Sequence, residues 1–315
     1  MSNTGKNRVR RALLAAALGA PQLAYAAPPY HPRAIVLTAF PLEFRVWQAT
    51  GRYTHTVRVP GLPRPMICNT RRVCVAITGE GEINAAVRTT AIVRDPRLDC
   101  RATLFIRSGI AGGVQSRAAL GSVYLANWIV SWGFGHHYLT RSGHMAWAPP
   151  RPPYAHNPWD TLAYRVAPGL LSAAYAATRA MPLSDSAAVL PLDAVLSLHK
   201  HPRVYEGANV SGDDFWIGRQ NQRIARHIVA LYTHGTARYA TTAMEDLGDI
   251  AALAAFGLQH HYLSVRAVSD IDVPPPATSV GAIIAKGDEY AGALAAGNAY
   301  LVTRRIIAHL VLHKP

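Results

Sequence analysis

Carboxyl groups at three turns of this sequence are suited to acid–base chemistry. Asp270 ends the strand-like run LSVRAVSD, Glu43 lies in the turn AFPLEF, and Glu245 lies in the turn TTAMEDLGD. A carboxyl that is partly withdrawn from water has a raised pKa, so it retains a proton that it can donate to a leaving group. A carboxylate that stays ionised can take a proton from water or accept hydrogen bonds from hydroxyls. Proton transfer and hydrogen bonding to hydroxyls are thus the chemistry that these three residues could supply.

These turns connect elements that predict one α/β domain over residues 27–315. Strand-like runs lie at 34–40, 73–79, 103–109, 122–131, 203–212 and 261–270, and helix-like runs lie at 84–95, at 245–257 and within 281–313. This alternation favours a central, largely buried mixed sheet flanked by helices. Open α/β sheets bind ligands outside the carboxyl ends of their strands, where most of the polar and glycine-containing turns lie.

Five of these turns, in their order and spacing, resemble those of the nucleoside phosphorylase and nucleosidase superfamily. They lie at 39–44, 107–113, 211–216, 241–249 and 266–270. Within the superfamily, the chain resembles the signal-bearing proteins of the purine nucleoside permease family, from about Ala34 to Asp272. The resemblance implies a nucleoside phosphorylase-like fold and a purine nucleoside as ligand, with inosine, adenosine and guanosine as candidates.

The resemblance also implies a role for each candidate site residue. Asp270 would protonate or hydrogen-bond N7 of the purine, and Ser269 would orient it. Glu245 would bind the 2′ and 3′ hydroxyls of the ribose, with Met244 beneath the sugar, while Phe215 would stack on the base. Other interpretations are a turn cap for Asp270, an ordinary acid in the first helical turn for Glu245 and a core position for Phe215 or Trp216.

Two residues bear on the choice between hydrolysis and phosphorolysis. Glu43 occupies a turn where, by resemblance, nucleosidases carry a glutamate that positions water and phosphorylases carry an arginine that binds phosphate. Arg107 opens the turn RSGIAGG, which also supplies Gly112, and it lies where phosphorylases carry their other phosphate arginine. The hydroxyl residue expected three positions later is Ile110. We therefore predict hydrolysis, with Arg107 alternatively a strand-end charge paired with a site carboxylate.

The sequence leaves three functions open. The first is a purine nucleosidase, in which Glu43 activates water and Asp270 protonates the base. The second is a binding component that delivers purine nucleosides to a separate membrane carrier without catalysis. The third is a phosphorylase that depends on phosphate. A pure binding protein needs neither a water-activating Glu43 nor a proton-donating Asp270, so their joint presence favours catalysis.

Residues 1–26 are predicted to be a signal peptide, because a basic stretch and a short apolar run precede the small-x-small pattern Ala24-Tyr25-Ala26. Arg10 and Arg11 allow a twin-arginine signal as a second interpretation. We expect an exported, periplasmic or secreted protein whose mature chain has no transmembrane segment. The formal net charge of +14 includes four basic residues of this segment, and the remaining Lys and Arg are scattered, so we expect no nucleic-acid partner.

Several further expectations concern cofactors, cysteines and assembly. The turn TGEGEINAA at 78–86 has Asn84 in place of the third glycine of a dinucleotide fingerprint, so we expect no cofactor of that kind. The histidines of the elaborated loop at 132–160 lack a recognised zinc spacing, and we expect no metal. Cys68 and Cys74 are either a disulfide or small apolar residues of a buried strand. The resemblance implies a homo-oligomer.

Overall fold

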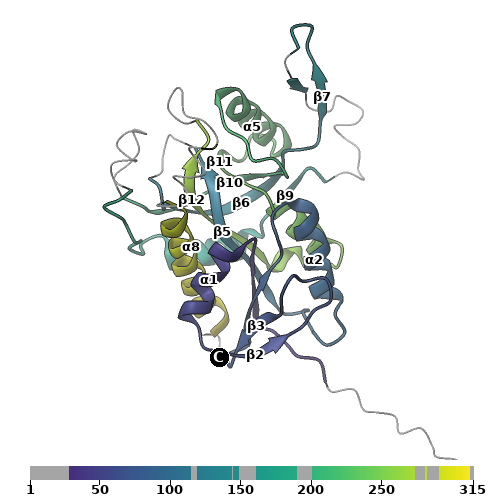
Figure 1. Ribbon diagram of the computed structural model, residues 1–315, viewed down its shortest axis with the longest axis vertical. Coiled ribbons are helices and arrows are strands. Elements are labelled where there is room, and N and C mark those ends of the chain that lie inside the picture. The colour runs from purple at the N-terminus through teal and green to yellow at the C-terminus, as the bar shows by residue number, and fades with distance from the viewer. Residues whose placement is uncertain are drawn as a thin grey trace, which may run out of the picture.

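The chain is built around a ten-stranded mixed sheet (Figure 1). The computed structural model describes residues 28–114, 119–143, 145–148, 161–189, 201–273, 281 and 291–312. The strand order is β11–β10–β6–β12–β5–β1–β4–β3–β2, with β9 paired to β6. The strands are β1 (Ala34–Thr38), β2 (Tyr53–Val57), β3 (Met66–Asn69), β4 (Val73–Ile77), β5 (Leu104–Gly113), β6 (Val123–Ser131), β9 (Ala163–Arg165), β10 (Val204–Ser211), β11 (Tyr239–Ala243) and β12 (Tyr262–Ile271).

The middle of the sheet is parallel and deeply buried. Strand β1 pairs in parallel with β4 and β5, and β12 pairs in parallel with β5. Every residue of β1 and β4 is buried, as expected for apolar runs that are covered on both faces. Strand β6 runs antiparallel to β12, while β2 and β3 extend the other edge in antiparallel pairs. The predicted α/β fold with a central mixed sheet is confirmed.

Five strands form a closed circuit that positions the site. Strand β12 lies between β5 and β6, β10 joins β6 to β11, and β11 pairs back onto β5, where Thr242 lies opposite Gly112. A bulge between Val268 and Asp270 shifts β12 along β5 at the same end. The circuit therefore brings the carboxyl ends of β5, β11 and β12 together.

Helices cover both faces of the sheet (Figure 1). On one face, α8 packs on α1, β5 and β12; on the other, α2 packs against α6. Helix α8 buries nine residues, which explains its largely apolar sequence. The helices are α1 (Pro41–Thr50), α2 (Glu82–Arg94), α3 (Pro168–Thr178), α5 (Arg219–Tyr232), α6 (Asp246–Ala254) and α8 (Gly292–Ile307).

The structure differs from the sequence-based expectations in three places. The segment at 107–113 is not a turn but the second half of β5, because β12 pairs with it as far as Gly113. The turn at 39–44 passes directly into α1, with Pro41 at its start. Within the predicted loop at 132–160, β7 (His136–Leu139) and β8 (Met145–Ala148) form a hairpin. His144, His156 and the predicted signal peptide at 1–26 lie outside the described residues.

A disulfide joins Cys68 of β3 to Cys74 of β4, two residues directly opposite each other in the sheet. Both half-cystines are fully buried, and Cys100 is a buried free cysteine. The two interpretations of this pair thus coincide, since Cys74 is bonded and also belongs to a buried strand.

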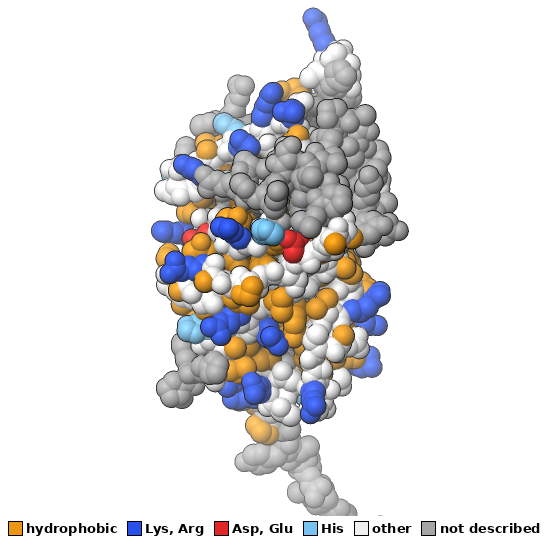
Figure 2. Space-filling model, turned by 90° about the vertical axis from the view of Figure 1, so that its left-hand side faces the viewer, with side chains coloured by type: hydrophobic (Ala, Val, Ile, Leu, Met, Phe, Trp, Pro, Cys, Tyr) orange, Lys and Arg blue, Asp and Glu red, His pale blue; other side chains and the backbone are white. Residues whose placement is uncertain are grey.

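Basic side chains are spread over the face of the molecule that carries α1 and α8, and few acidic ones appear there (Figure 2). Among the residues that the structure describes, no helix is long and apolar enough to cross a bilayer.

Candidate active site

A pocket of about 460 Å³ opens at the carboxyl ends of β5, β11 and β12. Its wall includes seven of the eight residues singled out from the sequence, namely Glu43, Gly112, Phe215, Met244, Glu245, Ser269 and Asp270. Four further side chains that bear on its chemistry are Phe40, Glu80, Thr242 and Arg266. Turns that are far apart in the sequence therefore meet in one concave site.

Glu43 lies in the first turn of α1 and is almost wholly buried. Its carboxylate accepts hydrogen bonds from the backbone amides of Ala39 (2.6 Å) and Ile110 (2.9 Å). Glycine at position 109 leaves the room for it, because a Cβ there would stand 2.2 Å from Glu43 Oε1. Burial raises the pKa of Glu43 to about 7. The side chain is therefore poised to exchange a proton near neutral pH.

Arg266 is the main charged residue of the pocket that sequence reasoning did not assign to the site. It is fully buried on β12, and its guanidinium pairs with Glu245 (2.6 Å) and Asp246 (2.5 Å). It also donates to the carbonyl oxygen of Ile110 (3.0 Å). The available signal was a charged residue inside an otherwise apolar strand, which requires a partner when buried.

Glu245 stands at the N-terminal boundary of α6, where β11 ends. Its Oε2 accepts from Arg266, while its Oε1 faces the amide of Gly81 at 3.4 Å. Asp246, the next residue, is buried below the pocket and also accepts from the hydroxyl of Tyr262 (2.9 Å). Arg266 and the amide of Gly81 thus contact the two carboxylate oxygens of Glu245 and fix its orientation in the pocket wall.

The glycine turn before α2 also reaches the pocket through Glu80. Gly81 has a φ of +88°, which favours glycine, and a Cβ there would stand 2.5 Å from Asp213 Oδ1. That carboxylate accepts from the amide of Glu82 at 2.6 Å. Burial raises the pKa of Glu82 to about 7. Glu80 thus adds one acidic side chain to the pocket wall, and Asp213 holds the turn through the amide of Glu82.

Asp270 lies at the end of β12 with its side chain only partly buried. The hydroxyl of Ser269 lies 2.8 Å from Asp270 Oδ1 and also lies 3.3 Å from the carbonyl oxygen of Ala111. A Cβ at position 112 would stand 3.3 Å from Asp270 Oδ2. Gly112 therefore lets the strand approach closely on this side, and Ser269 orients the carboxyl.

Asp272, which sequence reasoning did not single out, is buried behind the pocket wall. It accepts hydrogen bonds from the hydroxyls of Thr242 (3.0 Å) and Tyr239. Burial raises the pKa of Asp272 well above the usual range for a carboxyl, which favours its protonated form. Asp272 fixes Thr242, which lines the pocket beside Gly112.

Arg107 is the one predicted site residue outside the pocket wall. It is fully buried, pairs with Asp249 (2.6 Å) and donates to the hydroxyl of Thr78 (2.7 Å). Its geometry agrees with the alternative interpretation, in which this strand charge is paired with a nearby carboxylate. Burial raises the pKa of Asp249 to about 6 despite the adjacent guanidinium.

The two adjacent aromatic residues of the 211–216 turn face different surroundings. Phe215 is 44% exposed and lines the pocket. Trp216 packs into an aromatic stack with Trp132 at 4.6 Å between ring centroids, and Trp147 continues this stack at 6.4 Å from Trp132. Phe215 is therefore the ring available to a ligand, while Trp216 belongs to the core around the hairpin.

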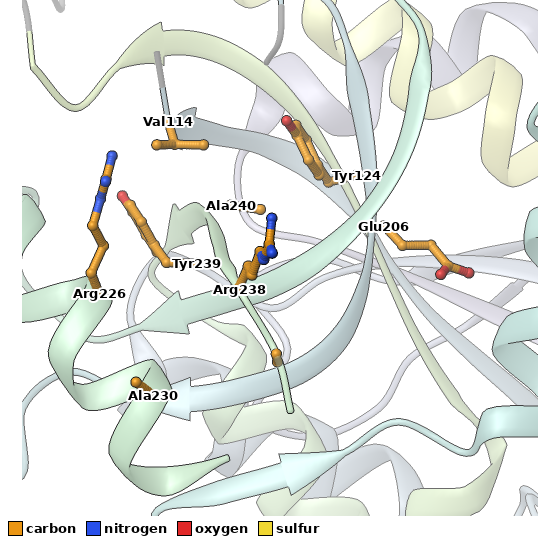
Figure 3. A pocket seen from close by; sticks show the side chains of 9 residues that line it. Val114, Tyr124, Glu206, Arg226, Ala230, Arg238, Tyr239 and Ala240 are labelled. Atoms are coloured by element: carbon orange, nitrogen blue, oxygen red, sulfur yellow. The ribbon is translucent and has the colours of Figure 1, made fainter. Parts of the chain in front are cut away.

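A separate cavity of about 360 Å³ lies beside Tyr239, between β6, β10, β11 and α5 (Figure 3). Arg226 and Tyr239 point the same way in it, whereas Glu206 points away from both (Figure 3). Its polar side chains do not converge as those of the 460 Å³ pocket do. In the described part of the chain, no group of three or more His, Cys, Asp or Glu side chains is arranged to hold a metal ion.

Comparison with known proteins gives two kinds of relative. The sequence model of the family described as purine nucleoside permease matches residues 31–314. A purine nucleoside permease of Candida albicans is 28% identical over 274 residues, which cover 79% of this chain and 68% of that protein. A 5′-methylthioadenosine/S-adenosylhomocysteine nucleosidase of Mycobacterium bovis is 25% identical over 201 residues, covering 64% of this chain and 70% of that protein.

Solved structures show the same fold. The crystal structure of 5′-methylthioadenosine/S-adenosylhomocysteine nucleosidase from Neisseria meningitidis, in complex with methylthio-immucillin-A, aligns with a TM-score of 0.59. The alignment covers 88% of this chain and 99% of that chain at 20% sequence identity. The predicted nucleoside phosphorylase-like architecture is therefore confirmed.

Proposed function

Because this chain belongs to the purine nucleoside permease family, we propose that its pocket binds a purine nucleoside and hydrolyses the N-glycosidic bond. The observation that carries the proposal is the convergence of Glu43, Glu245 and Asp270 in one pocket of about 460 Å³. Its size suits a nucleoside, since small-molecule sites fall between about 300 and 1,000 Å³. The proposal includes an exported protein that assembles as a homo-oligomer.

In the proposed reaction, Glu43 is the general base. With a pKa raised to about 7 by burial, a substantial fraction of its carboxyl is ionised at neutral pH. It takes a proton from a water molecule as the water oxygen bonds to C1′ of the sugar. The C1′–N9 bond breaks, and its electron pair stays with the purine. The products are the free base and ribose.

Asp270 is the proposed general acid. Protonation of N7 converts the departing base into a neutral leaving group, and the proton comes from the Asp270 carboxyl that Ser269 orients. Glu245 accepts hydrogen bonds from the ribose hydroxyls and stabilises the positive charge that develops on the sugar. Phe215 supplies an exposed ring on which the base stacks, worth roughly 1–3 kcal/mol in comparable contacts.

The charge of the pocket favours water over phosphate as the nucleophile. Glu43, Glu80, Glu245 and Asp270 line it, whereas its single arginine, Arg266, is already paired with Glu245 and Asp246. Arg107 is paired behind the wall. No guanidinium in the described wall is therefore left to bind a phosphate dianion, and the carboxylates repel it.

The test is to incubate the protein from residue 27 onward with inosine, adenosine or guanosine, in the presence and absence of phosphate. We expect free base and ribose at the same rate in both conditions. Release of ribose 1-phosphate only when phosphate is present would instead establish phosphorolysis. N-terminal sequencing of the protein secreted by its source would test cleavage after Ala26, with which the Cys68–Cys74 disulfide is compatible.

A second function is favoured by the name of the relatives. The Candida albicans protein is called a permease, and this chain could serve as a binding component that passes nucleosides to a membrane carrier. Calorimetric titration distinguishes the two functions. Stoichiometric nucleoside binding with no base released over hours would support delivery, and it would make Asp270 a recognition group.

A further inference from the structure

A larger cavity, of about 950 Å³, lies at the opposite end of the strands that carry the active site. Its wall includes Arg33, which immediately precedes β1, Leu104 at the start of β5, and His261, which immediately precedes β12. Strands β1, β5 and β12 are parallel neighbours, so this amino-end pocket and the carboxyl-end pocket lie at the two ends of the same three strands.

The amino-end pocket carries an excess of positive charge. Three guanidiniums line it, those of Arg33, Arg72 and Arg101, together with one carboxylate, Asp99. Asp99 pairs with Arg101 at 2.5 Å and also faces His31 at 3.2 Å. The Arg101 charge is thus neutralised within the wall.

The other two arginines have no carboxylate partner among the described residues. Arg33 donates to the carbonyl oxygen of Val311, a neutral acceptor, and its side chain is half-buried. Arg72 is exposed and forms no ion pair in the described part of the chain. Two guanidinium charges therefore remain for a ligand, and this number matches a phosphate monoester, which carries about −1.5 to −2 at neutral pH.

Neutral donors complete the charged side of the pocket. Helix α3 begins at Pro168 without a side-chain cap, and Gly169 and Leu170 of its first turn line the cavity. The amides of a first helical turn have no partner within the helix and point toward a bound anion. Among the described residues, His261 Nδ1 is also buried without a hydrogen-bond partner.

We propose that the amino-end pocket binds a phosphorylated organic molecule, with its phosphate held by Arg33, Arg72 and the first turn of α3. The remaining wall is largely apolar, with Leu170, Ala173 and Leu310 facing the cavity. It takes the organic part of the ligand, for which 950 Å³ is ample room. The site shares no lining residue with the carboxyl-end pocket, so its test does not depend on the proposed nucleoside chemistry.

Two variants test the site, with phenyl phosphate as the probe in calorimetric titration. Gly169→Asp puts a carboxylate into the phosphate position; a Cβ there meets no atom within 4 Å, and an acid suits the start of a helix, so the fold is retained. Arg72→Asn removes one guanidinium, and Asn tolerates the φ of +60° at this position. Arg223→Gln, on the exposed face of α5, removes the same charge elsewhere.

We expect phenyl phosphate to bind the unaltered protein, and each of the first two variants to weaken that binding by about tenfold or more. Arg223→Gln leaves it unchanged. Phenol, which lacks the phosphate, and inorganic phosphate, which lacks the ring, both bind more weakly than phenyl phosphate. Absence of measurable binding at millimolar probe, or equal binding by Gly169→Asp and the unaltered protein, overturns the proposal. Equal affinity for inorganic phosphate refutes the assignment of an organic ligand.

Discussion

The two pockets at opposite ends of β1, β5 and β12 carry opposite charges and differ in how deeply those charges are buried. The carboxyl-end pocket has four carboxylates and one arginine, and Glu43, Glu245 and Arg266 are each less than 6% exposed. The amino-end pocket has three arginines and one carboxylate, and Arg72 and Arg101 are exposed. Water screens the exposed charges of Arg72 and Arg101. Glu43, Glu245 and Arg266 instead depend on ion pairs and hydrogen bonds within the protein.

This difference determines where the loss of a charged partner lowers the stability of the fold most. A buried ion pair that loses one partner destabilises a protein by about 3–5 kcal/mol, while an exposed pair contributes about 0–1 kcal/mol. Substitutions of the buried, paired charges at the carboxyl end should therefore affect both activity and stability, and those of the exposed charges at the amino end should affect ligand binding with little change in stability.

The largest expected effect is on catalysis at Asp270. Replacement by Asn removes the proton donor, and we expect base release to fall by about 10²–10⁴-fold. Stability should change little, because the side chain is only partly buried and Ser269 can still donate to the amide oxygen. Steady-state release of free base and urea unfolding measure the two quantities. Asp214→Asn, an exposed carboxylate that does not line the pocket, is the control with the same charge change.

Arg266→Met tests the cost of leaving buried charge unpaired. Glu245 and Asp246 both lose their guanidinium partner, so we expect a loss of about 3–5 kcal/mol in the free energy of unfolding. Arg72→Asn, at the other pocket, should cost less than about 1 kcal/mol. Equal losses for the two variants in urea unfolding would mean that the buried charges around Arg266 contribute no more to stability than the exposed Arg72 does.

Glu43 links stability and activity to pH in opposite directions. Its pKa in the folded protein is raised to about 7 from 4.5, so the folded state holds a proton that the unfolded state has lost. Its contribution to stability is full below pH 4.5 and is lost as pH rises to 7, by up to about 3 kcal/mol. Base release should rise over pH 6–8, because the ionised carboxylate is the proposed base.

Glu43→Gln separates this effect from those of the other buried acids. The variant should show a shallower fall in unfolding free energy between pH 5 and pH 8 than the unaltered protein, together with a large loss of base release. An identical pH slope in both proteins would remove Glu43 as the titrating group.

Several of these residues were foreseeable from sequence and others were not. Asp270, Glu43 and Glu245 stand next to strand ends, and the geometry of α/β sheets brings such positions together. The partners of Arg266 could not be read from the chain, because pairing with Asp246 depends on how α6 sits against β12. The amino-end pocket left no local signal either, since Arg33 and its acceptor Val311 are 278 positions apart.

The smallest expected effect, and the most direct contrast, comes from adding one methyl group at each pocket. At Gly112 a Cβ would stand 2.5 Å from Asp272 Oδ1 and 2.6 Å from Thr242 Oγ1, so Gly112→Ala must displace a buried hydrogen-bonded pair. We expect a loss of about 1–3 kcal/mol. At Gly169 a Cβ meets no atom within 4 Å, and Gly169→Ala in a helix should stabilise by about 0.4–1 kcal/mol. Opposite signs in urea unfolding would show that the carboxyl end is closely packed around its charges and the amino end is open; equal signs would contradict that contrast.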